Sequence, residues 1–364
     1  MKKLHLMLIC WLITFSLTAQ QKLKTQNVIL ITLDGMRWQE VFAGAEKRLL
    51  LNKDFTDDTT TLKKLFWDES SKKRRELLMP FLWEVIGKQG QLYGNRSLGN
   101  RVNTVNTMWF SYPGYNEILT GFADDVNIAS NDKVNNPNRN VLEFVQSQKG
   151  FGNRVAAFTS WETFPFIINS ARNKIPVNSG VVKAKGNLSD REKLLNELSF
   201  QLPNDEGQTR LDALTFQYAF EHLKLNHPRL LFISFDETDH FAHEGDYDRY
   251  LKSAHYTDDM IRDLWEWVQS DPSYKDKTTL IITTDHGRGN KTEDDWKHHG
   301  SKMPEADQIW FAFLGPDTPE LGEVNAQQQL YQNQVAKTIT TFLSLEYINQ
   351  PKPGEPILSA IIKP

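Results

Sequence analysis

The stretch Ile281-Ile282-Thr283-Thr284-Asp285-His286-Gly287 gives the clearest indication of the fold. Its first half continues an apolar, β-branched run that begins at Thr278, and such a run is typical of a strand buried on both faces of a parallel sheet. The run ends on an adjacent carboxylate and imidazole, which can bind a divalent metal through oxygen and nitrogen. Ligands bind where loops converge at the strand tips of open α/β sheets. An Asp-His-Gly sequence alone is more often only a polar turn. Whether it indicates a metal site depends on the residues that follow the other predicted strands.

Two further apolar runs are also followed by residues that can bind a metal. Residues 27–33 form a second predicted buried strand, and Asp34 follows it directly. Residues 229–235 form a third, and Asp239 and His243 follow at a spacing of four, which places both on one face of a helical turn. The carboxyl ends of three predicted strands therefore carry metal-ligand residue types.

The alternation of strands and helices along the chain predicts an α/β fold, a three-layer αβα sandwich with a mostly parallel central sheet. Further strands are predicted at 154–159 and 308–315, and helices at 80–87, 141–145, 211–225, 247–268 and 334–345. With no linker and no internal repeat, we expect one domain over residues 21–364, with insertions near 45–77 and 160–210. The first insertion reads as charged and irregular, and its basic run at 72–75 as the solvated face of a helix.

The first twenty residues differ from the rest of the 364-residue chain, which has an ordinary globular composition with 39% hydrophobic and 24% charged residues. Lys2 and Lys3 precede an apolar run, 4–17, that is too short for a membrane span, so residues 1–20 read as a signal peptide. We expect a periplasmic or secreted mature chain without a membrane span. It would contain no cysteine, because Cys10 lies in the removed segment, and this excludes disulfides and thiol catalysis.

The formal net charge is −4, and removal of the two lysines makes it −6. Such a mildly acidic protein has no general electrostatic attraction for nucleic acid duplexes or anionic membranes. An anionic substrate would need a local source of positive charge, which a metal cluster can provide.

A hydroxyl is predicted just before the N-terminus of another helix. Ser111 precedes Pro113, which suits the first turn of a helix because its missing N–H is not needed there. The free N–H groups and the dipole at a helix N-terminus favour a bound anion. Ser111 could equally be a plain N-cap. Thr104 and Thr107 are alternative nucleophiles, but no proline follows them to start a helix.

The polar residues at the strand tips, with this serine and a later histidine, form one candidate constellation: Asp34, Ser111, Asp239, His243, Asp285, His286 and His299. Such a set can hold two divalent metal ions, and its mixture of nitrogen and oxygen donors suits Zn²⁺ better than magnesium. Two metals about 3.5–4 Å apart can clamp the attacking and leaving oxygens of an in-line displacement. A hydroxyl bound to such a metal becomes a nucleophile near neutral pH.

These residues, in this order, resemble the alkaline phosphatase superfamily, and within it the type I phosphodiesterase and nucleotide pyrophosphatase branch. The resemblance covers residues 27–357, and the family motifs are matched at Asp34, 111–121, 239–243, 284–287 and 299–300. It implies an exported, metal-dependent phosphoric ester hydrolase that acts on small phosphate esters or nucleotides. Ser111 takes the place of the nucleophile and would form a phosphoseryl intermediate.

The resemblance also implies a division of the ligands between the two metals. One metal would bind Asp34, Ser111, Asp285 and His286, and the other Asp239, His243 and His299. In this family, an asparagine some twenty residues after the nucleophile contacts a phosphoryl oxygen. Asn131 is the predicted counterpart, with Asn127 as the alternative.

The chain departs from the branch at several positions. Ser111 replaces the usual threonine, Gly114 replaces an asparagine, and residues 160–162 read Ser-Trp-Glu where some phosphomonoesterases carry a Lys/Arg pair. The last departure favours diesters and nucleotide pyrophosphates over monoesters. The alternatives are a phosphomonoesterase of the same superfamily, or a sulfatase if Ser111 is converted to formylglycine. In the sulfatase motif, however, Tyr115 stands where an arginine is expected.

Two further alternatives are disfavoured. A phosphoglycerate-mutase-like isomerase does not fit the export signal, because its substrates are cytosolic. A catalytically inactive metal- or phosphate-binding protein does not fit the intact ligand set.

Overall fold

An eight-stranded sheet is the centre of the protein, and its strands follow the order β10-β2-β9-β7-β1-β6-β4-β5. The computed structural model describes residues 22–202 and 209–361, so the predicted signal peptide at 1–20 lies outside the described residues. Every neighbouring pair in the sheet is parallel except those that β9 makes with β7 and β2. The strands are β1 (Asn27–Leu33), β2 (Gln91–Tyr93), β4 (Val155–Thr159), β5 (Val177–Ser179), β6 (Leu230–Phe235), β7 (Thr278–Thr283), β9 (Phe311–Leu314) and β10 (Gly322–Glu323).

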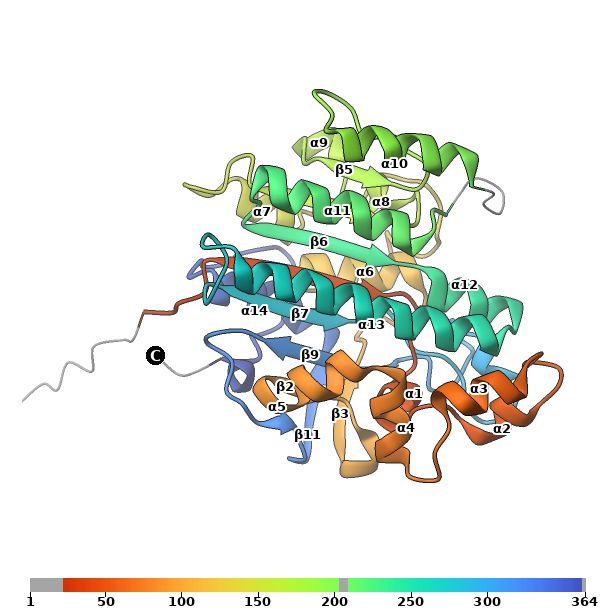
Figure 1. Ribbon diagram of the computed structural model, residues 1–364. Coiled ribbons are helices and arrows are strands. Elements are labelled where there is room, and N and C mark those ends of the chain that lie inside the picture. Colours follow the sequence, from red (N-terminus) through yellow and green to blue (C-terminus); the bar gives the residue numbers. More distant parts are fainter. Residues whose placement is uncertain (1–21, 203–208, 362–364) are drawn as a thin grey trace, which may run out of the picture.

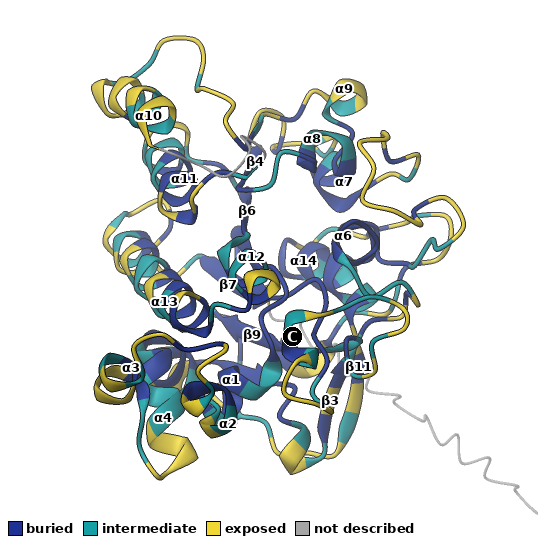
Figure 2. Cartoon of the chain, turned by 90° about the vertical axis from the view of Figure 1, so that its right-hand side faces the viewer, coloured by how far each residue is buried: buried dark blue, intermediate teal, exposed yellow. Residues whose placement is uncertain are grey.

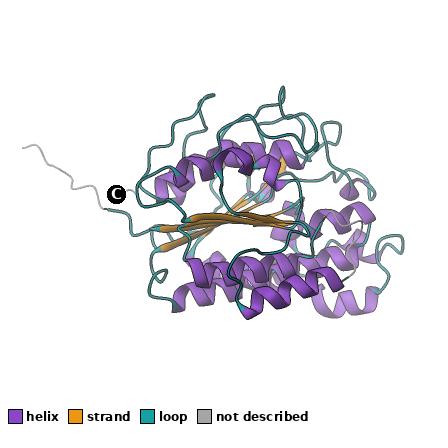
Figure 3. Cartoon of the chain, turned by 90° about the horizontal axis from the view of Figure 1, so that it is seen from above, coloured by secondary structure: helices purple, strands orange, loops and turns teal. Residues whose placement is uncertain are grey.

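Helices cover both faces of this sheet, and Figure 3 shows the resulting three layers edge-on. On one face lie α11 (Asp212–Asn226) and α13 (Tyr247–Ser270), which stand on the opposite side of the sheet from α6 (Ser111–Thr120), α7 (Val141–Gln146) and α14 (Val335–Phe342) in Figure 2. The predicted α/β fold with a mostly parallel central sheet is therefore confirmed.

Strand β1 shows why the sheet must be covered on both faces. All seven of its residues are buried. Because successive side chains of a strand point to opposite faces, Ile29 and Ile31 enter the hydrophobic core on the side of α13, whereas Val28 and Leu30 enter the core that includes residues of α6 and α14. β1 pairs in parallel with β6 on one side and β7 on the other, so the carboxyl ends of these three strands lie next to one another.

Apart from the helix face at 72–75, the segment 45–77 was predicted to be irregular, and this prediction was wrong. It contains α2 (Lys47–Leu51), α3 (Thr59–Phe66) and α4 (Ser71–Leu78), which bury leucine and phenylalanine side chains in the core (Figure 1). The segment 160–210 contains α8 (Phe164–Ile167), α9 (Ser170–Asn173), the edge strand β5, and α10 (Asp190–Gln201). Short apolar stretches between charged residues had hidden these helices.

The predicted strand 308–315 is divided between two sheets. β8 (Gln308–Ile309) joins β3 (Asn100–Asn103) and β11 (Gln328–Tyr331) in a three-stranded sheet, whereas β9 belongs to the main sheet. Trp310 lies between them, fully buried, and its indole nitrogen donates to the carbonyl of Met36 at 3.0 Å.

The remaining helical elements are α1 (Trp38–Ala43), η1 (Leu82–Ile86), α5 (Gly87–Gln89), η2 (Arg96–Leu98), α12 (Glu237–Glu244), η3 (Asp295–Lys297), η4 (Gln332–Gln334) and η5 (Leu358–Ala360). Of these, α12 is the one that follows β6 and carries two of the candidate ligands. Within residues 22–202 and 209–361, no helix is both long enough and apolar enough to cross a bilayer.

The basic run at 72–75 is only partly solvated, which corrects the interpretation of it as a solvated face. Lys72 is exposed, but the guanidinium of Arg75 donates to both carboxylate oxygens of Glu323 at 2.9 Å and to the carbonyl of Phe42 at 3.2 Å. It also lies 3.5 Å from the ring centroid of Trp83. Arg75 therefore ties α4 to β10.

We expect Arg75→Ala to destabilise the protein by about 2 kcal/mol, because it removes charge-assisted hydrogen bonds that are mostly shielded from water. Lys72→Ala, in the same run, should change the free energy of unfolding by less than about 0.5 kcal/mol. Chemical denaturation of both variants measures the difference. Equal effects of the two substitutions would contradict the assignment of a structural role to Arg75.

Candidate active site

Carboxylates follow the three central parallel strands where these strands end. Asp34 follows β1, Asp236 follows β6, and Asp285 lies two residues beyond the end of β7. Gly35 allows the close approach of the chain at this edge. It has a φ of 56°, and a Cβ there would come within 2.6 Å of Asp239 Oδ1. Any larger residue at this position would collide with a predicted metal ligand.

Asp34, Asp285 and His286 form one group, in which one ligand atom from each residue lies within 4.8 Å of the others. All three are buried. The Nε2 atom of His286 lies 3.4 Å from Asp34 Oδ1 and 3.4 Å from Asp285 Oδ2. Among the described residues, these two carboxylate oxygens are buried without a hydrogen-bond partner. Buried charged oxygens need a counter-charge, so this group fits a bound cation.

The orientation of His286 supports the same conclusion. Its Nδ1 atom lies 2.9 Å from the carbonyl oxygen of Gly287, which can only accept a hydrogen bond. The neutral ring therefore carries its proton on Nδ1 and has a lone pair on Nε2. That lone pair points to the two unpartnered carboxylate oxygens, as a metal ligand requires.

Asp239, His243 and His299 form a second group of the same kind. Asp239 and His243 lie one turn apart on α12, with Asp239 Oδ2 at 3.2 Å from His243 Nε2. The Nε2 atoms of His243 and His299 are 2.8 Å apart. The side chain of His243 is 46% exposed, so this group opens to solvent whereas the first does not.

The two groups are adjacent. Asp239 Oδ1 lies 3.8 Å from His286 Nε2 and 3.7 Å from His299 Nε2. The rings of His286 and His299 stack with their centroids 4.1 Å apart. Two cations held by these groups would therefore be neighbours, as a two-metal centre requires.

The pKa values of the site residues are shifted because several charged groups are buried close together. Burial, together with the charge of Asp239, raises the pKa of Asp34 well above its usual value. Burial and the charge of Asp34 do the same for the pKa of Asp285. Burial also acts on Asp239, but the charges of Arg288 and His243 outweigh it and hold the pKa of Asp239 well below the usual range. Burial, reinforced by His286, lowers the pKa of His299 and favours the neutral imidazole that a metal ligand must be.

Ser111 lies next to the first group, with its Oγ atom 3.5 Å from His286 Nε2. It is the first residue of α6 and Phe110 is the N-cap, whereas the sequence had placed Ser111 just before the helix. The alternative hydroxyls are engaged elsewhere. Thr104 Oγ1 donates to the carbonyl of Asn106 at 3.2 Å, and Thr107 Oγ1 donates to Asp125 at 2.7 Å.

The structure distinguishes the two candidate asparagines. Asn131 accepts a hydrogen bond from the backbone N–H of Tyr112, at 2.9 Å through Oδ1, and so lies beside the start of α6. Asn127 donates instead to Asp124 at 3.0 Å, within its own loop. A backbone N–H can only donate, so Oδ1 of Asn131 is fixed as the acceptor and its NH₂ group is left to donate.

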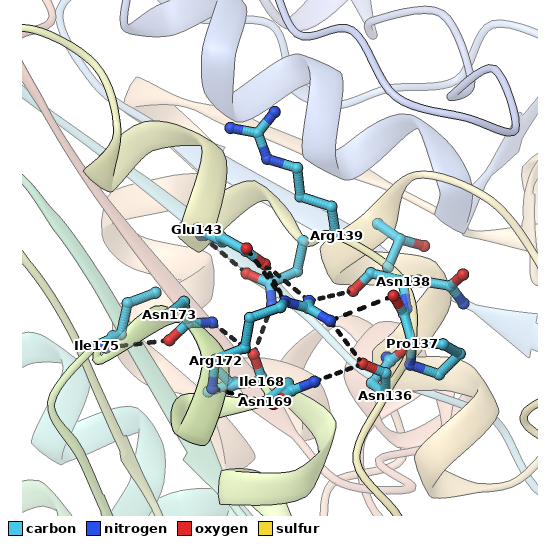
Figure 4. Close-up of polar contacts among 12 residues, drawn as sticks. Asn136, Pro137, Asn138, Arg139, Glu143, Ile168, Asn169, Arg172, Asn173 and Ile175 are labelled. Atoms are coloured by element: carbon cyan, nitrogen blue, oxygen red, sulfur yellow. Dashed lines mark hydrogen bonds and ion pairs between the residues drawn. The ribbon is translucent and has the colours of Figure 1, made fainter.

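Arg172 holds residues 136–138 of the loop that follows Asn131, and Figure 4 shows these contacts. The guanidinium donates to the carbonyls of Asn136 at 3.1 Å, Pro137 at 3.2 Å and Asn138 at 2.8 Å, and it pairs with Glu143 at 2.8 Å. Arg172 comes from α9, within the insertion at 160–210, so this insertion supports the loop beside Ser111.

Sequence reasoning missed three residues that hold the site. The hydroxyl of Tyr115 donates to Asp34 Oδ2 at 2.9 Å, which explains the presence of a tyrosine where a sulfatase motif has arginine. The buried amide of Gln332 donates to the carbonyls of Thr284 and Asp285 at 3.1 and 2.7 Å. Arg288 pairs with Asp239. Its only signal in the sequence was a cation directly after the Asp-His-Gly turn.

Comparison with known structures places this geometry in a familiar fold. The alkaline phosphatase PafA aligns with a TM-score of 0.60 at 10% identity, over 93% of this chain and 99% of that one. Murine ectonucleotide pyrophosphatase/phosphodiesterase 5 aligns with a TM-score of 0.56 at 14% identity, over 91% and 98% of the two chains. The 2-O glycosaminoglycan sulfatase BT1596 aligns with a TM-score of 0.57 at 11% identity, over 93% and 74%. At these identities, the likeness concerns the fold alone.

The sequence comparison identifies the family. No curated protein sequence matches the chain significantly. The family model for type I phosphodiesterase / nucleotide pyrophosphatase matches residues 50–336, which is most of the chain. This match agrees with the resemblance inferred from the motifs. The chain belongs to the type I phosphodiesterase / nucleotide pyrophosphatase family, a family of phosphoric ester hydrolases.

Proposed function

We propose that this chain is an exported two-metal phosphoric ester hydrolase that cleaves phosphodiesters or nucleotide pyrophosphates in preference to monoesters. The observation that carries the proposal is the pair of adjacent ligand groups, Asp34–Asp285–His286 and Asp239–His243–His299, with Ser111 beside the first. Export rests on the signal-peptide pattern at residues 1–20.

The residues present fit two divalent cations. Members of this family are metal-dependent, and three carboxylates with three imidazoles make a donor set that suits Zn²⁺. The unpartnered oxygens of Asp34 and Asp285 support the first site. Bound cations would stabilise the negative charge on the attacking, leaving and phosphoryl oxygens.

Ser111 would be the nucleophile. Its Oγ attacks phosphorus and loses its proton to solvent, while the bond from phosphorus to the leaving oxygen breaks and that oxygen takes up a proton. A water molecule then attacks the phosphoseryl phosphorus, and the bond to Oγ breaks to restore the serine. The NH₂ group of Asn131 would donate to a phosphoryl oxygen, since its Oδ1 is held by Tyr112 N–H.

The preference for diesters follows from the segment after β4. Ser160 Oγ donates to Asp212 at 2.6 Å, and Glu162 pairs with Lys133 at 2.9 Å. Residues 160–162 therefore offer no lysine or arginine where a Lys/Arg pair would bind the extra charge of a monoester, and the carboxylate of Glu162 is already paired. A diester carries one negative charge fewer and depends less on such cations.

A panel of three nitrophenyl substrates tests the proposed reaction class. We expect kcat/KM to be highest for the phosphate diester, lower for the monoester and lowest for the sulfate ester, with all turnover lost to a chelator and restored by zinc. Sulfate cleavage faster than both phosphate classes would instead favour the sulfatase alternative and require conversion of Ser111 to formylglycine.

Substitution of the nucleophile gives a second test. Ser111→Ala should lower kcat by more than about 10³-fold, because the alternative hydroxyls of Thr104 and Thr107 are engaged elsewhere. It should keep both metals because each retains three protein ligands. Ser111→Thr should retain measurable turnover, since the hydroxyl survives. The nucleophile would have to be reassigned if Thr107→Ala were equally inactive, or if a labelled phosphopeptide mapped away from Ser111.

The substitution Asp34→Asn tests the stability of the metal-free protein and its binding of metal separately. In chelator, this variant should melt at a higher temperature than the wild type, because it removes one of several repelling buried carboxylates while its amide oxygen can still accept from Tyr115. With zinc, the order should reverse, since cation binding at about 100 times Kd adds about 2.7 kcal/mol per site and the variant lacks a ligand.

The same charges set the pH dependence of the metal-free protein. Folded Asp34 and Asp285 bind protons more tightly than the unfolded chain, whose aspartates titrate near the ordinary value of 3.8. The free energy of unfolding of the chelated wild type should therefore fall as the pH rises above that value, and Asp34→Asn should show a shallower fall. Identical pH profiles would contradict the charge-repulsion account.

A further inference from the structure

Arg288 is a buried cation that is linked through the backbone to one ligand group and through its side chain to the other. Its side chain is fully buried. It follows Asp285 and His286 on the same turn, so the backbone fixes it to the first ligand group. Its guanidinium pairs with Asp239 of the second group and donates to the backbone carbonyl of Asp239 at 3.1 Å.

The other arm of the guanidinium reaches the loop that carries His299. Nη1 of Arg288 donates to the carbonyl of Lys297 at 2.6 Å, two residues before His299. The planar guanidinium of an arginine donates hydrogen bonds in fixed directions, so it constrains the orientation of its partners as well as their distance. One side chain therefore joins α12, the His299 loop and the tip of β7, which are the three elements that carry all the candidate metal ligands except Asp34 and Ser111.

The two oxygens of the Asp239 carboxylate have different partners. Oδ1 is the atom that Arg288 holds, and Oδ2 is the atom that lies 3.2 Å from His243 Nε2. With Oδ1 engaged, the carboxylate cannot rotate freely, and Oδ2 stays directed to the side on which His243 lies. Groups that orient a metal ligand in this way typically contribute 10- to 100-fold to metal affinity, by rough estimate.

We propose that Arg288 is a positioning residue for the second metal group, which holds Asp239 and the His299 loop in register so that Asp239, His243 and His299 can bind one cation. This inference rests on the proposed two-metal function. Asp34, Asp285 and His286 of the first group form no hydrogen bond or ion pair with the guanidinium, so this group should bind its cation largely independently of Arg288.

The test is a measurement of zinc content at graded free zinc concentrations, which needs no assay of activity. Wild-type protein should bind two zinc ions. Arg288→Gln should bind the first with little change and the second at least about tenfold more weakly. Arg288→Lys should fall between the two, because a lysine keeps the charge but loses the fork. If Arg288→Gln does not fold, the lysine variant carries the comparison.

Two matched variants make the result specific. Arg210→Gln removes an arginine that is as buried as Arg288 but bonds to Asn178, Thr159 and Thr215, and it should leave both zinc ions bound. In a His243→Ala background, where the second group is already broken, Arg288→Gln should cause no further loss of zinc.

The outcomes separate the inference from the function on which it rests. Wild-type protein that binds fewer than two zinc ions would overturn the proposed function. Wild-type protein that binds two, with Arg288→Gln binding both as tightly or losing both equally, would overturn the positioning role alone.

Discussion

The site depends on the repulsion among three carboxylates, those of Asp34, Asp239 and Asp285, which the fold brings to one edge of the sheet. The parallel pairing of β1 with β6 and β7 fixes the ends of these strands side by side, and burial removes the water that would screen the charges. The chain offsets part of this repulsion by a hydrogen bond from Tyr115 and an ion pair with Arg288. The proposed cations would offset the remainder.

Much of this arrangement could be predicted from the sequence, because the central strands are buried on both faces and their short, β-branched apolar runs are typical of such strands. The predicted range of β1, 27–33, is the one observed, and β6 and β7 differ from prediction by one residue at one end. The ligand residues follow strand ends directly, so predicting the strands also predicted where their side chains would meet. All seven candidate ligands lie together in the structure.

The features that the sequence did not predict depend on contacts between distant parts of the chain. Arg75 meets Glu323 across 248 positions, and no local pattern distinguishes it from the exposed Lys72. Trp310 lies within a continuous apolar run, so the change from one sheet to another has no local signal. Arg288 lies beside the predicted ligands, yet its role depends on where α12 and a later loop are placed. In each case the role of the residue depends on its neighbours in the folded protein and not on its residue type alone.

Every residue of α6 is buried, including the serine at its first position. A helix packed on all sides tolerates little change in sequence, whereas the loop that carries Asn131 is largely exposed and its support comes from a separate insertion. If Ser111 and Asn131 act as proposed, the chemical step and the recognition of the substrate reside in parts of the chain with very different freedom to vary. New substrates could be acquired by remodelling the loop and its insertion, with the reacting serine left undisturbed. Such a division would make this enzyme a suitable scaffold for directed evolution of specificity.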